Sequence, residues 1–174
     1  MSRVTSAYLV EPDSAQLLQL GGMGLIVEVA NERLAGRAAV MRIRLDGRRV
    51  IPPHLHRRED EVSHVLRGPV GVLVGDEEFQ APSGCLVLGP KDLFHAYWSP
   101  GDDQVEFLTF ITPGGFEHFF EEFHSAFESV NTERVDPSEV AARRAELADR
   151  YGLMHSRELL DGLRERHGLR ALGE

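Results

Sequence analysis

The feature that most limits the fold is a series of short apolar runs between residues 25 and 112, each ended by turn-forming residues. Pairs such as Asp46-Gly47, Gly68-Pro69 and Gly75-Asp76 separate these runs. Closely spaced, strand-length segments with no helix between them are typical of an antiparallel sandwich or barrel, and not of a parallel α/β sheet. The runs expected to form strands are Leu25–Val29, Ala38–Leu45, Val62–Leu66, Val70–Val74, Cys85–Leu88 and Val105–Ile111.

The spacing of apolar residues becomes helical after Pro113-Gly114-Gly115. Five phenylalanines follow at i, i+3, i+4, i+7 and i+11, which places them on one stripe of an amphipathic helix. We expect this helix to pack against the open face or mouth of the β domain. The stripe consists of Phe116, Phe119, Phe120, Phe123 and Phe127.

Two further helices are predicted near the C-terminus. One begins with Asp136 as the cap and Pro137 in the first helical position, and ends at Gly152. The other covers residues 156–167 and ends at Gly168. A short helix is also predicted near Ser14–Leu20. The expected organisation is a lead-in at 1–24, a β-barrel domain at 25–130 and a helical extension at 131–174.

Charge and composition argue against several classes of partner. The chain has 19 basic and 28 acidic residues, a net charge of −9, and this opposes binding to nucleic acid or to anionic membranes. No apolar run approaches the roughly 20 residues of a spanning helix. The single cysteine, Cys85, excludes an internal disulfide and multi-cysteine metal sites, and its apolar neighbours predict that it is buried. A cytoplasmic location is expected.

The most informative polar residues are histidines near Glu61. His54 and His56 are spaced so that both side chains point to one face of a strand. A turn through residues 57–60 then brings Glu61 back beside them, and His95 follows later in the chain. Imidazoles and a carboxylate together suit first-row divalent metals. His95 could complete a set of three histidines and one glutamate.

Two motifs carry a resemblance to a known family. His54, His56, Glu61 and Gly68 match G-x5-H-x-H-x3,4-E-x6-G, the first motif of the cupin family, although Gly47 lies one residue too far from His54. The chain therefore resembles a cupin.

The second cupin motif, G-x5-P-x-G-x2-H-x3-N, is matched by Gly84, Pro90 and His95. Asp92 stands in place of the inner glycine and Ser99 in place of the asparagine. Neither replaced residue is a metal ligand in the family, so these departures affect the shape of the turn and not metal binding.

The resemblance implies a mainly β fold, a cupin-type antiparallel barrel or jelly roll followed by α-helices. It also implies one divalent transition metal (Fe, Ni, Mn, Co, Cu or Zn) held by His54, His56, Glu61 and His95. The chain is most similar to small cupins akin to quercetin 2,3-dioxygenase, which share a Pro-Pro-His-x-His-x-x-x-Asp-Glu segment and a Thr-Pro-Gly-Gly-Phe-Glu-x-Phe-Phe segment. The implied activity is a metal-dependent dioxygenase, an oxidoreductase that acts on a phenolic or enolic molecule, with Glu61 also serving as general base.

Strand alternation assigns sides to the neighbours of these residues. Ser63 shares a face with Glu61, and Tyr97 shares a face with His95, so both are candidates for contact with substrate. His64 is predicted to face outward. Arg42 and Arg44 alternate on an outer face and could meet acidic residues of a second subunit.

The other polar clusters are interpreted as solvated surface. We expect Arg57–Asp60 to form an exposed charged turn. The remaining histidines are assigned to exposed helical faces; they are His118, His124, His155 and His167.

Two alternatives to the dioxygenase remain open. One is a non-redox cyclase or isomerase that acts on a polyketide-like substrate, and the other is a cupin that binds a small ligand without catalysis. The expected partners are a small-molecule substrate, dioxygen for the oxidative reading, and a second copy of the chain. Pairing is expected because an N-terminal edge strand with an arginine-bearing outer face needs a cover.

Overall fold

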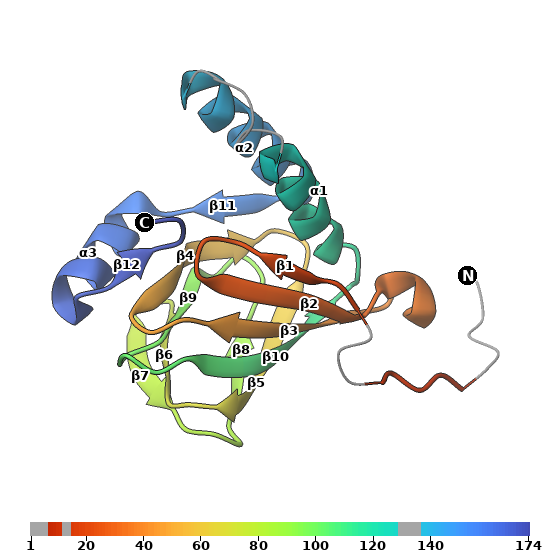
Figure 1. Ribbon diagram of the computed structural model, residues 1–174, viewed down its shortest axis with the longest axis horizontal. Helices are drawn as coiled ribbons and strands as arrows, with labels where there is room; N and C mark the ends of the chain where they lie inside the picture. Colours follow the sequence, from red (N-terminus) through yellow and green to blue (C-terminus); the bar gives the residue numbers. More distant parts are fainter. Residues whose placement is uncertain (1–6, 12–14, 129–136) are drawn as a thin grey trace.

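The computed structural model describes residues 7–11, 15–128 and 137–174. Within these residues the strands form two six-stranded sheets that enclose a common core, followed by three α-helices (Figure 1). The predicted mainly β fold with C-terminal helices is confirmed. The strands are β1 Leu17–Gln19, β2 Met23–Val29, β3 Ala39–Leu45, β4 Arg49–His56, β5 Asp60–Arg67, β6 Val70–Val74, β7 Glu77–Ala81, β8 Leu86–Gly89, β9 His95–Trp98, β10 Val105–Thr112, β11 Leu153–His155 and β12 Arg170–Ala171. The helices are the 3-10 helix η1 Asn31–Leu34 and the α-helices α1 Glu117–Glu128, α2 Pro137–Tyr151 and α3 Arg157–His167.

The first sheet has the order β1-β2-β3-β10-β5-β8. Its strands alternate buried and partly exposed residues, as an antiparallel sheet with one face on the core requires. Arg42 and Arg44 lie on the outer face, but their acidic partners belong to the same chain. Arg42 pairs with Glu28 and Glu106, and Arg44 Nε is 3.2 Å from Glu106 Oε1. The arginines therefore form ion pairs with acidic side chains on neighbouring strands of the same chain.

The second sheet has the order β11-β4-β9-β6-β7, with β12 beside β4. All four residues of β9 are buried, because its two faces are covered by different layers. Tyr97 belongs to the core between the sheets, whereas Trp98 packs in a second cluster that includes Leu163 of α3. Helix α3 therefore covers the outer face of this sheet.

Strand β4 accommodates two prolines in the middle of a sheet. Proline has no N–H to donate to a neighbouring strand, and it is expected only at edges or bulges. The pairing of β4 with β9 shifts register between Ile51 and His54, so Pro52 and Pro53 fall at the irregularity. Regular pairing resumes with His54 opposite His95.

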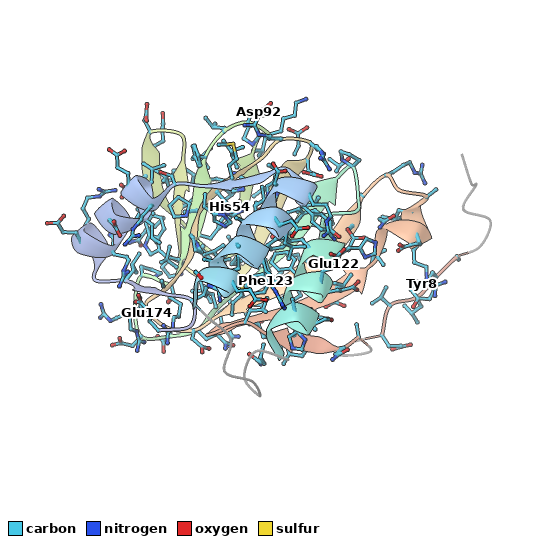
Figure 2. All side chains as sticks on the ribbon, turned by 90° about the horizontal axis from the view of Figure 1, so that it is seen from above. Tyr8, His54, Asp92, Glu122, Phe123 and Glu174 are labelled. Carbon is cyan, nitrogen blue, oxygen red and sulfur yellow. The ribbon has the colours of Figure 1, made fainter. Side chains whose placement is uncertain are left out.

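Helices α1 and α2 lie side by side over the barrel (Figure 2). Phe116 and Phe119 are buried in the main core, and Phe120 and Phe123 pack against it, as the stripe predicted. The side chain of Phe127 lies outside the described residues.

The start of α1 is held by Glu117, which is fully buried. One of its carboxylate oxygens accepts from the backbone N–H and the side-chain amide of Asn31, both at 2.7 Å. The other accepts from the backbone N–H of Gly115 at 2.8 Å. This carboxylate therefore fixes the helix over the barrel.

The structure differs from the sequence predictions in three places. The segment predicted as a helix near Ser14–Leu20 contains strand β1, because pairing with β2 overrides its weak helical pattern, and Ser14 lies outside the described residues. Cys85 is exposed, because it lies in the turn just before the edge strand β8. Between the two predicted C-terminal helices, β11 adds a strand to the second sheet and carries His155.

The other helix boundaries agree with prediction. Gly152 and Gly168 both have positive φ after the ends of α2 and α3, and Ser156 caps α3. Asp136, the predicted cap of α2, lies outside the described residues. None of the described helices is both long enough and apolar enough to cross a membrane.

We expect Leu163→Ala to lower the free energy of unfolding by about 2–5 kcal/mol, because it leaves a cavity between α3 and the second sheet. Urea denaturation followed by circular dichroism measures the change. The matched control is Leu9→Ala in the N-terminal lead-in, whose side chain is 75% exposed and should cost less than about 0.5 kcal/mol. Equal effects of the two substitutions would show that α3 does not contribute to the core.

Candidate metal centre

Four side chains from three strands meet inside the barrel. His54 and His56 come from β4, Glu61 from β5 and His95 from β9. One candidate ligand atom from each lies within 4.8 Å of those from the other three. The structure thus brings together all four residues that the sequence singled out, and their role as metal ligands stays a prediction.

The protonation of two of these rings follows from their backbone partners. Nδ1 of His54 is 2.8 Å from the carbonyl oxygen of Pro52, and Nδ1 of His95 is 3.0 Å from that of Leu93. A carbonyl oxygen can only accept, so both Nδ1 atoms carry a proton. In the neutral rings each Nε2 then presents a lone pair to the centre of the site.

His56 is fully buried, and neither of its ring nitrogens has a hydrogen-bond partner among the described residues. Its Nε2 is 3.6 Å from Glu61 Oε2, and Nε2 of His95, also without a partner, is 3.7 Å from the same oxygen. Buried polar atoms without partners cost free energy, and a divalent cation is a partner that imidazole nitrogens and a carboxylate can share. The residues present therefore fit a metal ion.

Glu59 lies behind His56. Its Oε2 is 3.8 Å from His56 Nδ1, and its side chain is buried. The prediction of a solvated turn is confirmed for Arg57, Arg58 and Asp60, which are exposed, but is wrong for Glu59, because the turn between β4 and β5 directs this carboxylate back toward the ring. A carboxylate on the far nitrogen of a ligating histidine orients the ring and strengthens it as a donor.

The electrostatics of the cluster favour a neutral His54 beside an ionised Glu61. Burial, together with His95 and His56, lowers the pKa of His54 well below its ordinary value. Burial opposes the ionised form of Glu61, but His56 and His95 hold the pKa of this carboxyl well below its usual range. Burial also opposes a charged His95, yet Glu61 raises the pKa of that ring. A cation bound at this position would compete with a proton on His95.

Tyr97 and Ser63 have different positions beside Glu61. The Tyr97 hydroxyl is buried without a hydrogen-bond partner among the described residues, and burial and the charge of Glu61 raise its pKa well above the ordinary value. It therefore remains a protonated donor. The Ser63 hydroxyl donates to Glu61 Oε1 at 3.1 Å and is 2.8 Å from Thr109 Oγ1. The Ser63 hydroxyl is thus engaged with Glu61, and its contact with substrate stays a prediction.

Three of the four candidate ligands border a small cavity, which shares lining residues with a larger one. The inner cavity has a volume of about 30 Å³ and is lined by His54, His56, Glu61 and Tyr97 with mostly apolar neighbours. The outer chamber has a volume of about 730 Å³ and lies between the barrel, α1, α2 and β11. His54 lines both, and so do Met23, Ile51, Phe116 and Phe120.

Two histidines that were assigned to exposed helical faces line the outer chamber. His155 lies on β11, opposite His54, and the two ring centres are 6.3 Å apart. His124 lies on α1 and is partly buried. The sequence did not predict the position of His155, because nothing in residues 153–155 indicates pairing with β4. His64 faces outward on β5, as predicted.

Residues 41–111, which include all four candidate ligands, match the family model for the cupin domain. The matched segment covers less than half of the chain. Helices α1, α2 and α3 lie outside the matched residues. No curated protein sequence matches the chain.

Solved structures show the same fold at low sequence identity. KdgF from Halomonas sp. is 14% identical with a TM-score of 0.58, over 65% of this chain and 99% of that one. A predicted oxalate decarboxylase from Thermotoga maritima is 16% identical with a TM-score of 0.58, over 61% and 99%. The polyketide cyclase RemF from Streptomyces resistomycificus is 17% identical with a TM-score of 0.53, over 62% and 80%. These similarities establish the cupin fold.

We expect His56→Ala to reduce bound divalent metal to the background of the dialysed protein, because it removes a central ligand. His64→Ala, on the outer face of β5, is the matched control and should keep the wild-type content. Glu59→Gln should weaken metal binding by roughly 10- to 100-fold while leaving the site intact. Elemental analysis after dialysis measures all three, with circular dichroism to verify folding. Full metal content in His56→Ala would exclude this ligand set.

Proposed function

We propose that the chain is a metal-dependent cupin enzyme of the dioxygenase type that acts on a phenolic or enolic small molecule. The observation that carries the proposal is the carboxyl group of Glu61, which is buried beside three histidines and lines a mostly apolar cavity. His54, His56, Glu61 and His95 would hold the ion. When bound, it supplies Lewis acidity toward a substrate oxygen and, for a redox-active metal, access to dioxygen.

The chain's own residues can deprotonate a hydroxyl at this position. Glu61 Oε1 is occupied by the Ser63 hydroxyl, so Oε2 is the oxygen that remains to accept a proton. The inner cavity contains no second carboxylate among its described lining residues. Tyr97 can donate a hydrogen bond to an oxygen that gains negative charge, because it stays protonated. The apolar wall, which includes Met41, limits the entry of water.

A non-redox cyclase or isomerase for a polyketide-like substrate is the second candidate. It is favoured by the size of the outer chamber, which falls within the range of pockets that hold drug-sized molecules. Metal identity separates the two candidates: iron, nickel, manganese or copper favours oxygen chemistry, and zinc favours Lewis-acid catalysis. Oxygen uptake with a panel of flavonols tests the dioxygenase hypothesis directly. A cupin that only binds its ligand would show binding without turnover in either assay.

We expect Glu61→Gln, at equal metal occupancy, to lower the single-turnover rate by roughly 10²- to 10⁴-fold, because an amide can coordinate but cannot accept the proton. The measurement is single-turnover rate against pH for metal-loaded protein. Ser63→Ala is the control, since it removes the hydrogen bond to Oε1 but keeps the carboxylate, and it should cost less. Equal rates for wild type and Glu61→Gln at every pH would reduce Glu61 to a ligand and favour the non-redox candidate.

We also propose that the chain forms a homodimer, through the outer face of the first sheet. Leu86 and Leu88 on β8 and Phe110 on β10 are exposed there. Val62 of β5 lies between them, opposite both Leu88 and Phe110. A contiguous apolar patch next to an edge strand is a surface that proteins usually cover.

We expect the wild type to sediment as a dimer at tens of micromolar and Leu88→Asp to sediment as a monomer, because the new charge would be buried without a partner. Phe79→Asp is the matched control, since Phe79 is 43% exposed on β7 of the other sheet, and it should remain dimeric. A monomeric wild type, or a dimeric Leu88→Asp, would contradict this interface.

A further inference from the structure

The outer chamber has an unusual lining for an acidic protein. The chain carries a net charge of −9, yet none of the described residues that line the chamber is Asp or Glu. Among the described lining residues, Arg144 of α2 is the only one that is fully charged, and three histidines accompany it. The rest of the wall is mainly apolar. The described lining is compatible with an anionic or aromatic ligand. It offers no carboxylate that could pair with a cationic ligand.

The apolar part of the wall is aromatic and ordered by ring contacts. Four phenylalanines of the segment 116–123 line the chamber. Phe119 stacks on Phe116 with ring centres 5.3 Å apart and contacts Phe123 at 5.7 Å. Aromatic rings offer large flat contact areas that favour another planar ring. A compact, fully hydrated sugar would gain little against this surface.

Arg144 is held at the wall of the chamber. Its guanidinium carbon lies 5.6 Å from the centre of the Phe123 ring, and both residues line the chamber. A guanidinium group has five N–H donors in a planar fork, so one that stacks on a ring and has a further partner can still donate to a carboxylate through its other N–H groups. His124 of α1 lines the same chamber and can donate a further hydrogen bond.

We propose that the outer chamber binds a planar aromatic molecule that carries a carboxylate, with its ring on the phenylalanines of α1 and its carboxylate on Arg144. The proposal rests on the proposed function for the identity of the chamber as the substrate entrance, and it specifies the substrate class of that site. The anion-binding group comes from α2, which lies outside the matched cupin residues. Specificity would therefore be supplied by the C-terminal extension and the reactive groups by the barrel.

The test compares two probes that differ only in charge, 2-naphthoate and its neutral amide, by isothermal titration calorimetry on metal-free wild-type protein. We expect the carboxylate to bind about tenfold more tightly, since hydrogen bonds to a charged group are stronger than those between neutral groups. Arg144→Gln should abolish this preference while retaining amide binding. Arg143→Gln is the matched control, because Arg143 is exposed and pairs with Glu139 along the helix, and it should keep the preference.

Several results would overturn the proposal. These are equal affinity of the wild type for the two probes, no binding of either probe, or a preference for the carboxylate that survives in Arg144→Gln. Because metal-free protein is used, none of them depends on turnover. If the preference is found but metal-loaded protein turns over no phenol or enol, the chamber assignment stands and the proposed reaction fails. If metal-loaded protein turns over a phenol or enol but the preference for the carboxylate is absent, the proposed reaction stands and the chamber assignment fails.

Discussion

The burial of Glu61 among three imidazoles is the interaction on which the rest of the structure depends. An ionised carboxylate away from water is costly unless nearby groups stabilise its charge. Here the histidine rings lie 3.6 and 3.7 Å from one of its oxygens, and Ser63 donates to the other. Strands β4 and β9 pair in one sheet and β5 belongs to the other, and each must keep its register, since a slip of one residue would turn its side chains to the opposite face.

This constraint explains features that look unfavourable by themselves. Pro52 and Pro53 interrupt the pairing of β4 with β9, yet the irregularity ends with His54 directly opposite His95. Pro52 also supplies the carbonyl oxygen that fixes the ring of His54. Glu59 is buried at the turn, where it approaches the otherwise unpaired His56. The interrupted strand pairing and the buried carboxylate are each unfavourable for folding, and both lie at positions that orient the candidate ligands.

The helices extend this arrangement outward. Glu117 anchors α1 to η1 through two hydrogen bonds from Asn31 and accepts a third from Gly115, and the phenylalanine stripe then lies over the barrel. Strand β11 joins α2 to the edge of the second sheet and places His155 beside His54. The chamber that results has walls from both the barrel and the C-terminal extension. Its chemistry can therefore vary through residues such as Arg144 without change to the candidate ligands.

The sequence by itself determined the strand-rich barrel, the three C-terminal helices and the grouping of His54, His56, Glu61 and His95, because alternation, capping residues and motif spacing are local signals. Only the tertiary structure decided the remainder. The exposure of Cys85, the burial of Glu59 and the position of His155 all depend on which distant segment packs nearby. Strand β11 is three residues long, and its pairing with β4 is set by the helices on either side of it. Contacts between segments about a hundred residues apart leave no periodicity in a single sequence, so the outer chamber became visible only once the chain was folded.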